Sequence, residues 1–160
     1  GEVQAESAIE TMDAILAELF AAKRIYLRGK DGGAPPRAGE AGWAIQDDNE
    51  PVLQAGAEQI GWADEEHYYF LPQTLFRVLT DFKARLRQRF PVDLKALQTR
   101  LKDAGRLEAY NSGKRMYFTK KVCCDGQTQR VLKILRPIAS TLDDETQNAP
   151  AMPQLPQENQ

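Results

Sequence analysis

The sequence predicts an α+β domain, on two observations. Apolar residues recur at helical spacing in three segments, and shorter apolar segments bounded by turn residues read as strands between and after them. The chain has 160 residues, of which 42% are apolar, and this is enough for a hydrophobic core. We therefore expect a single domain over residues 1–137, compact from about residue 6.

A helix is predicted near the N-terminus, over residues 7–23. Ser7 and Glu10 have the spacing of a capping box, which satisfies the free amides at a helix start. The predicted apolar face consists of Ile9, Met12, Ile15, Leu16, Leu19 and Phe20. Residues 25–27 then read as a short strand, and glycine and proline make residues 29–42 a loop.

The next segment predicts a β-hairpin. Residues 60–63 and 67–71 have strand character, and the acidic residues 64–66 join them. The preceding residues 43–57 fit no single element. Within them, the Asp-Asp-Asn run at 47–49 is interpreted as a turn, because the spacing of a calcium-binding EF-hand does not follow it.

Two helices are predicted after this hairpin. Pro72 suits the first turn of a long helix over residues 72–90. The apolar spacing of that helix is carried by Leu75, Leu79, Phe82, Leu86 and Phe90. Asp93 can cap a short helix, and Gly105 can end it. The inward face expected for the short helix is Leu94, Leu97, Leu101 and Ala104.

A second hairpin is predicted to close the domain. Residues 107–110 read as extended and 111–114 as a turn, and strands over 117–124 and 129–135 are joined at Asp125-Gly126. From Pro72 on, the predicted elements follow the order of a winged helix-turn-helix: a long helix, a tight turn, a short helix, a strand and a basic hairpin. The predicted fold is thus α+β, a winged helix-turn-helix with an N-terminal helix and an extra β-hairpin.

The charge of the chain is divided between its two halves. Residues 72–137 contain sixteen Lys and Arg against five Asp and Glu, a net charge of +11. Residues 1–71 contain five against fourteen, a net charge of −9, and the formal net charge of −2 conceals this division. A basic helix-turn-helix and wing beside an acidic N-terminal part indicates a polyanion partner, with DNA first among them.

Side chains suited to DNA gather on two parts of the basic half. The outward face of the short helix is predicted to present Lys95, Gln98, Thr99, Arg100 and Lys102. The final hairpin and the turn before it carry Lys114, Arg115, Lys120, Lys121, Arg130, Lys133 and Arg136. Each cation alone is most simply a solvated surface residue. Together, on this pattern of elements, they predict binding to phosphates and base edges.

No constellation of catalytic residues is visible. The sequence has no phosphate-binding G-x-x-x-x-G-K-[ST] loop and no G-x-G-x-x-G motif, and its one histidine, His67, lies in a predicted strand. The adjacent Cys123 and Cys124 match no zinc spacing, and we expect one buried and one exposed thiol. We therefore expect a cytoplasmic, non-catalytic protein without cofactor, metal or membrane segment.

The main alternative is a winged helix used for contact with another protein. Exposed aromatic side chains would favour that function, and the candidates are Tyr110, Tyr117, Trp43 and Trp62, although each is expected in the core. Residues 138–160 are polar, rich in proline and glutamine, and predicted to be a disordered tail. The acidic run at 143–145 is expected to be solvated.

Short motifs in residues 60–137 resemble the C-terminal part of primase/helicase-like ATPases of phages and integrative elements. These motifs are Gly61 to Pro72, Phe90-Pro91-Val92 with the helix after it, Leu101 to Gly105, and Arg130-Val131-Leu132. The order of elements is also similar to the winged-helix C-terminal domains of conjugative relaxases.

The resemblance implies a DNA-binding appendage, cut from a longer protein, that anchors or orients a helicase or primase. Its expected partners are DNA and an ATPase module of the same or another chain. The resemblance assigns no catalytic residue, because the ATPase motifs are missing from this sequence.

Overall fold

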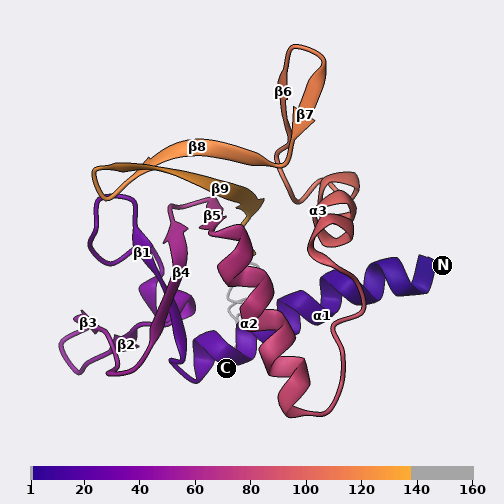
Figure 1. Ribbon diagram of the computed structural model, residues 1–160. Helices are drawn as coiled ribbons and strands as arrows, with labels where there is room; N and C mark the ends of the chain where they lie inside the picture. Colours follow the sequence, from indigo (N-terminus) through magenta and orange to yellow (C-terminus); the bar gives the residue numbers. More distant parts are fainter. Residues whose placement is uncertain (1, 138–160) are drawn as a thin grey trace, which may run out of the picture.

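The computed structural model describes residues 2–137, with side chains from Ala8 onward. The predicted disordered tail, residues 138–160, lies outside the described residues. Three helices pack beside a five-stranded mixed sheet, so the predicted α+β class is confirmed (Figure 1). The helices are α1 (Glu2–Ala21), α2 (Pro72–Arg85) and α3 (Leu94–Asp103), with a short 3-10 turn, η1 (Ala38–Ala41).

The main sheet has the strand order β1-β4-β5-β9-β8, and only β1 and β4 run parallel. Its strands are β1 (Ile25–Gly29), β4 (Glu58–Ala63), β5 (His67–Phe70), β8 (Thr119–Cys124) and β9 (Gln127–Leu135). Two small hairpins stand apart from the main sheet. One is β2 (Ala44–Ile45) with β3 (Pro51–Val52), and the other is β6 (Tyr110–Ser112) with β7 (Arg115–Tyr117).

The sheet buries both of its faces, to different extents. The large core on the helix side combines the apolar face of α1 with alternate residues of the strands, among them Ile60, Phe70, Leu132 and Ile134. The other face holds a small cluster of Trp62, Tyr69, Cys124 and Val131. Burial of Trp62 and Trp43 confirms that both tryptophans are core residues.

The first two helices differ in extent from the prediction. Helix α1 begins at Glu2, so the expected start at Ser7 is wrong, although the predicted apolar face is buried or partly buried. Helix α2 ends at Arg85 rather than at residue 90. Arg87 takes a left-handed backbone conformation with a φ of 59°, and the amides that follow Arg85 turn back onto the last helical carbonyls.

The early end of α2 separates two residues that were expected on one helical stripe. Leu86 is 54% exposed. Phe90 is buried from the connecting segment, where its ring meets that of Phe76 edge to face, with centroids 5.9 Å apart. The prediction that Leu86 and Phe90 share the buried face of one helix is therefore wrong.

Three local signals around α3 and the final hairpin are confirmed: the cap, the glycine after the helix and the two-residue turn. The Asp93 carboxylate accepts a hydrogen bond from the Ala96 amide at 2.8 Å, as a helix N-cap does. Gly105 follows α3 with a φ of 77°. Asp125 and Gly126 form the two-residue turn between β8 and β9, both with positive φ.

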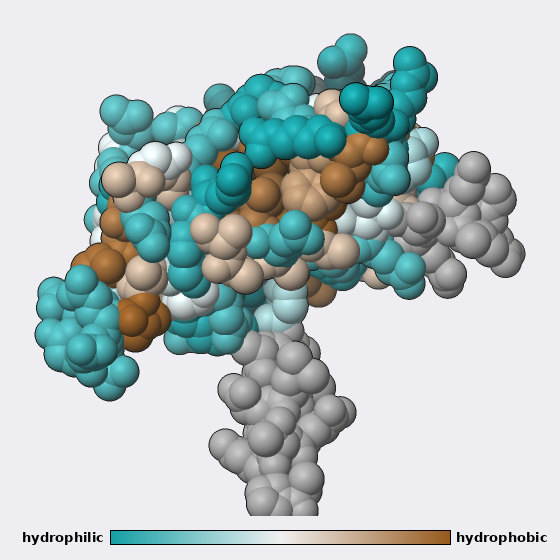
Figure 2. Space-filling model, turned by 90° about the horizontal axis from the view of Figure 1, so that it is seen from below, coloured by the Kyte–Doolittle hydropathy of each residue, from teal (hydrophilic) through white to brown (hydrophobic). Residues whose placement is uncertain are grey.

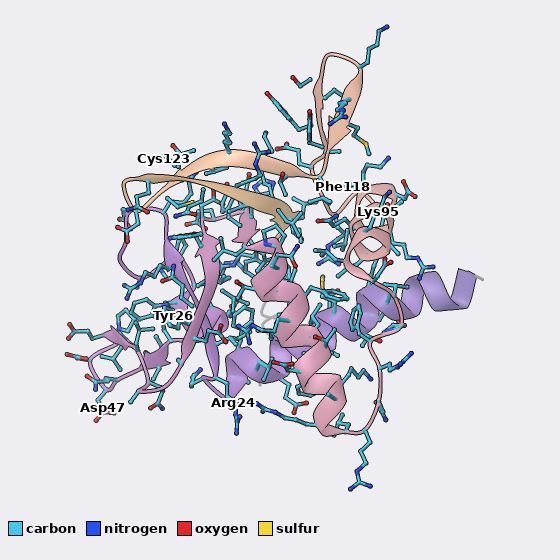
Figure 3. All side chains as sticks on the ribbon, viewed as in Figure 1. Arg24, Tyr26, Asp47, Lys95, Phe118 and Cys123 are labelled. Atoms are coloured by element: carbon cyan, nitrogen blue, oxygen red, sulfur yellow. The ribbon has the colours of Figure 1, made fainter. Side chains whose placement is uncertain are left out.

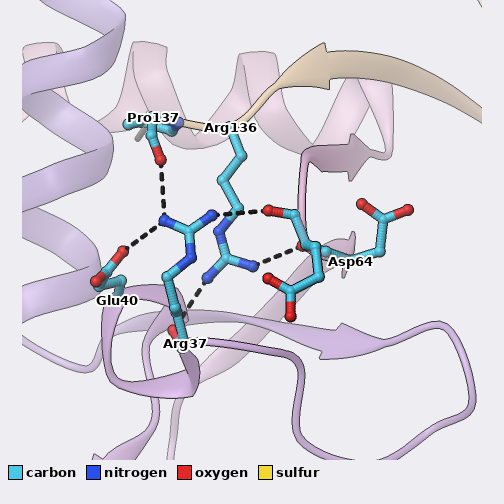
Figure 4. A network of polar contacts seen from close by, with 6 residues as sticks. Arg37, Glu40, Asp64, Arg136 and Pro137 are labelled. Atoms are coloured by element: carbon cyan, nitrogen blue, oxygen red, sulfur yellow. Dashed lines mark hydrogen bonds and ion pairs between the residues drawn. The ribbon is translucent and has the colours of Figure 1, made fainter. Parts of the chain in front are cut away.

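Two arginines hold the C-terminal end of β9 against the rest of the domain (Figure 4). Buried Arg136 donates to the carbonyls of Asp64 and Arg37 at 2.8 and 3.0 Å. Arg37 donates in turn to the carbonyls of Glu65 and Pro137 at 2.8 and 2.9 Å. The expectation that Arg136 is a surface cation of the wing is therefore wrong, because its side chain is buried among backbone acceptors.

Candidate nucleic-acid interface

Helix α3 presents only part of the donor face that the sequence predicts. Leu97 and Leu101 are fully buried, as expected. Lys95 is exposed and lies on α3 on the side of the molecule from which the β6–β7 hairpin projects (Figure 3). The other predicted donors of α3 are half-buried: Gln98, Thr99, Arg100 and Lys102.

Two further features of α3 bear on this face. Ala104, expected inward, is exposed, because it lies at the C-cap, where the helix has ended. Lys102 forms an exposed ion pair with Asp103 at 3.3 Å. Among the predicted donors of α3, Lys95 is therefore the one whose side chain is exposed to a ligand.

The β6–β7 hairpin carries two more of the predicted cations. Lys114 and Arg115 are exposed, at the turn and at the start of β7. In Figure 1 the hairpin projects from the body between α3 and β8. The sequence analysis expected an extended segment over 107–110, a turn over 111–114 and one strand over 117–124. The start of that strand is wrong, because Tyr117 ends β7 and β8 begins at Thr119. Tyr110 and Tyr117 are cross-strand partners, and this pairing of aromatic residues supports the hairpin.

A groove lies between this projecting hairpin and the β8–β9 hairpin, with a volume of about 370 Å³. We call it the tyrosine–cation groove. Its lining consists of Tyr110, Ser112, Tyr117, Thr119, Lys120, Lys121 and Arg130. Three of these side chains are cations, four carry a hydroxyl, and none is acidic.

Lys121 and Arg130 are directly opposite each other on the antiparallel strands β8 and β9. Both are exposed, and neither forms an ion pair with any residue that the structure describes. Arg130 Nη1 donates to Thr119 Oγ1 at 3.4 Å. Like charges placed directly opposite across two strands destabilise a sheet. The opposition of these two cations therefore lowers the stability of the fold.

Two other predicted cations are partly neutralised within the fold. Lys120 and Lys133 both contact Glu108 Oε1, at 2.9 and 3.0 Å. Their hydrogen bonds lower the pKa of Glu108 and outweigh the small opposing effect of its burial. Lys133 does not line the groove, whereas Lys120 does.

Tyr110 is an aromatic side chain that the sequence analysis placed in the core and that the structure places at the surface. It is 47% exposed, and Lys120 Nζ lies 5.9 Å from the centre of its ring. The prediction of a buried Tyr110 is wrong because β6 belongs to a two-stranded hairpin that projects from the domain and has no core of its own. Tyr117 is half-buried.

A second and larger groove lies between α1 and α2, with a volume of about 560 Å³. Figure 2 views the molecule from the end where α2 finishes and shows apolar surface among hydrophilic residues. Leu19, Val78 and Phe82 form apolar parts of this groove, and Arg24 and Arg85 line it as well. Arg85, the last residue of α2, thus belongs to this surface and does not line the tyrosine–cation groove.

The remaining reactive side chains form no recognisable chemical site. His67 begins β5 and is half-buried. Cys123 is exposed and Cys124 buried, as predicted. Among the side chains described, from Ala8 to Pro137, no group of three or more His, Cys, Asp or Glu is placed to hold a metal ion.

Among the helices of the described part, none combines the length and the hydropathy that a membrane span requires. Comparison of the chain with protein-family models, curated proteins and solved structures found no match.

Proposed function

We propose that this chain is a winged-helix DNA-binding domain, without catalytic activity, that anchors or orients a helicase or primase. The order α1, β5, α2, α3, β8, β9 supports the winged-helix interpretation, with β9 between β5 and β8 in the sheet. In this interpretation α2 and α3 are the helix-turn-helix and the β8–β9 hairpin is the wing. Residues between α1 and β5, and the β6–β7 hairpin, are insertions.

The observation that carries the proposal is the pairing of Lys121 with Arg130. Two cations directly opposite on neighbouring strands repel each other, and no described carboxylate pairs with either. Such repulsion lowers the stability of the free protein only slightly, and a bound polyanion removes it by neutralising both charges. DNA is a polyanion of sufficient charge density to do so.

The surroundings of this pair favour phosphate binding. Lys120 lines the same groove, and Lys114 and Arg115 lie on the hairpin that forms one wall. Acidic residues from the first half of the chain pair instead with cations outside the groove, Asp13 with Arg106 and Glu58 with Arg77. The division of charge seen in the sequence therefore leaves the groove cationic.

The role beside a helicase or primase rests on a different argument. It follows from the resemblance of residues 60–137 to the C-terminal part of primase/helicase-like ATPases. The β4–β5 hairpin and the start of α2, which carry the longest of those motifs, form a continuous part of the domain.

Charge reversal tests the proposal. The double variant Lys121→Glu with Arg130→Glu should weaken DNA binding at least tenfold, about 1.4 kcal/mol. A matched control, Arg85→Glu with Arg89→Glu, makes the same change in net charge at exposed positions outside the groove. Fluorescence anisotropy with labelled DNA measures both. Equal weakening by the two variants, with circular dichroism unchanged, would show attraction by net charge alone and would remove the groove from the proposal.

Contact with another protein is the second candidate function. The half-exposed Leu86, beside Phe82 at the end of α2, is the observation that favours it. An exposed Tyr110 was also expected to favour protein contact. Its neighbours in the groove are cations rather than apolar side chains, so here it favours a nucleic acid. If the groove variant keeps its DNA affinity but no longer retains a replication partner, protein contact replaces DNA binding.

A further inference from the structure

We infer that the tyrosine–cation groove binds an unpaired strand of DNA, with bases stacked on its tyrosines and phosphates on its cations. The inference deepens the proposed function and rests on it. A winged helix as such reads duplex DNA through its short helix and wing. The groove is a different kind of site, because it combines exposed aromatic and cationic side chains in a confined space.

The aromatic wall comes from the register of the β6–β7 hairpin. Tyr110 and Tyr117 are cross-strand partners, so their side chains leave the hairpin on the same face. Both line the groove, and Tyr110 keeps 47% of its surface exposed. An exposed tyrosine ring beside cations offers a flat face on which a nucleic-acid base can stack.

The opposite wall supplies the charge. Lys121 and Arg130 extend from β8 and β9 as a directly opposed pair, and both line the groove. Each can donate to a phosphate oxygen, and Arg130 is already oriented by its contact with Thr119. Lys120 is held by Glu108 at 2.9 Å, close to the ring of Tyr110, and as the strand neighbour of Lys121 it leaves β8 on the other face. The groove therefore combines the opposed pair Lys121 and Arg130 with the two tyrosines, which are the groups that phosphates and a base would contact.

The size of the groove and the nature of its walls select a single strand over a duplex. A volume of about 370 Å³ is at the lower end of the range for small-ligand pockets, roughly 300–1,000 Å³, so it suits a nucleotide rather than a double helix. The faces of paired bases are covered by their neighbours in a duplex. Only an unstacked base can therefore use Tyr110 as a stacking partner.

The test measures anisotropy of the full chain with an oligothymidine of about twelve nucleotides and a duplex of similar length, within the site sizes of single-strand binding domains. Tyr110→Ala should weaken binding of the single strand by roughly fivefold or more, the loss expected for one stacked base. Tyr110→Phe, which keeps the ring, should bind the strand like the parent. Duplex binding should change less than about twofold with either variant, since phosphate contacts alone remain.

A third probe separates stacking from charge. An oligomer of the same length with abasic sugars keeps the phosphates and removes the bases. Its binding should be insensitive to Tyr110→Ala yet weakened by Lys121→Glu with Arg130→Glu. Melting temperatures of the variants show that each remains folded.

The outcomes distinguish the inference from the function on which it rests. The inference fails if Tyr110→Ala weakens binding of the strand, the duplex and the abasic oligomer equally, or if it weakens none of them. The proposed function still stands in that case, provided that the charge-reversed variant loses duplex binding. If the parent chain binds no DNA at low salt, the proposed function fails as well.

Discussion

Arg106, just after α3, holds Asp13 of α1 through two hydrogen bonds of 3.0 and 3.1 Å. This two-point ion pair joins the acidic half of the chain to the basic half. Glu58 and Arg77 join the two halves a second time, through a single contact. Neither link involves a residue of the tyrosine–cation groove. Some acidic residues of the first half thus pair with basic residues outside the groove, and neither of these two ion pairs neutralises a cation that lines it.

The link between Asp13 and Arg106 should be a modest contributor to stability. Asp13→Asn removes the charge and leaves the shape, and we expect the free energy of unfolding to fall by about 1 kcal/mol or less, because both side chains are partly exposed. The loss should shrink at high salt, which screens such pairs. Urea unfolding at low and high salt measures this. A loss that is several times larger and independent of salt would contradict it.

A single charge reversal at Lys121 should separate stability from binding. Lys121→Glu places a carboxylate directly opposite Arg130, so repulsion across the strands becomes attraction. We expect a gain in the free energy of unfolding of about 0.2–1 kcal/mol together with weaker DNA binding. Urea unfolding and anisotropy of the same protein provide both values. A variant that is less stable, or that binds DNA as before, would show that the opposed cations are not kept for a polyanion.

Two substitutions on α3 should have opposite effects. Leu97 is fully buried, so Leu97→Ala should reduce the free energy of unfolding by about 2–5 kcal/mol through lost burial and a cavity. Lys95 is exposed, so Lys95→Ala should leave stability within about 0.5 kcal/mol, yet weaken DNA binding. Thermal unfolding and anisotropy test the pair. If Lys95→Ala leaves DNA affinity unchanged, α3 lies outside the interface and binding is confined to the hairpins.

Stability should fall in acid partly because of Asp64. Burial alone would raise the pKa of this carboxyl. Hydrogen bonds from the Tyr69 hydroxyl at 2.5 Å and from the amides of His67 and Glu66 outweigh burial and lower the pKa. A lowered pKa in the folded state contributes stability above the unfolded pKa and loses it as pH falls through the folded pKa.

Asp64→Asn should therefore be less stable than the parent at neutral pH and lose less stability on acidification. Glu65→Gln is the matched control, since the neighbouring Glu65 is exposed and its carboxylate makes no hydrogen bond within the described residues. Urea unfolding at neutral and strongly acid pH gives the comparison. Identical acid losses for the parent and Asp64→Asn would contradict the role of this carboxylate.

Local signals in the sequence predicted much of the fold. The cap at Asp93, the turn at Asp125-Gly126 and the β4–β5 hairpin depend on residues close together in the chain, so their chemistry is visible in the sequence. The end of α2 could not be predicted, because Arg87 takes a left-handed conformation that glycine usually signals. The parallel pairing of β1 with β4 joins residues about thirty positions apart and leaves no local pattern.

The candidate site was predictable in part. A two-residue turn at Asp125-Gly126 fixes the register of β8 and β9, so the opposition of Lys121 and Arg130 follows from the sequence. The pairing of Lys120 and Lys133 with Glu108 depends on tertiary contacts. The exposure of Tyr110 depends on a hairpin that stands apart from the core.

The salt dependence of DNA binding tests the central claim most directly. We expect roughly four to six phosphate contacts, so log affinity for a single strand should fall with log salt at a slope of about −3 to −4. The variant Lys121→Glu with Arg130→Glu should give a slope shallower by about one or more, because it loses two of these contacts. Binding that is independent of salt, or no binding to any DNA at low salt, would contradict the account.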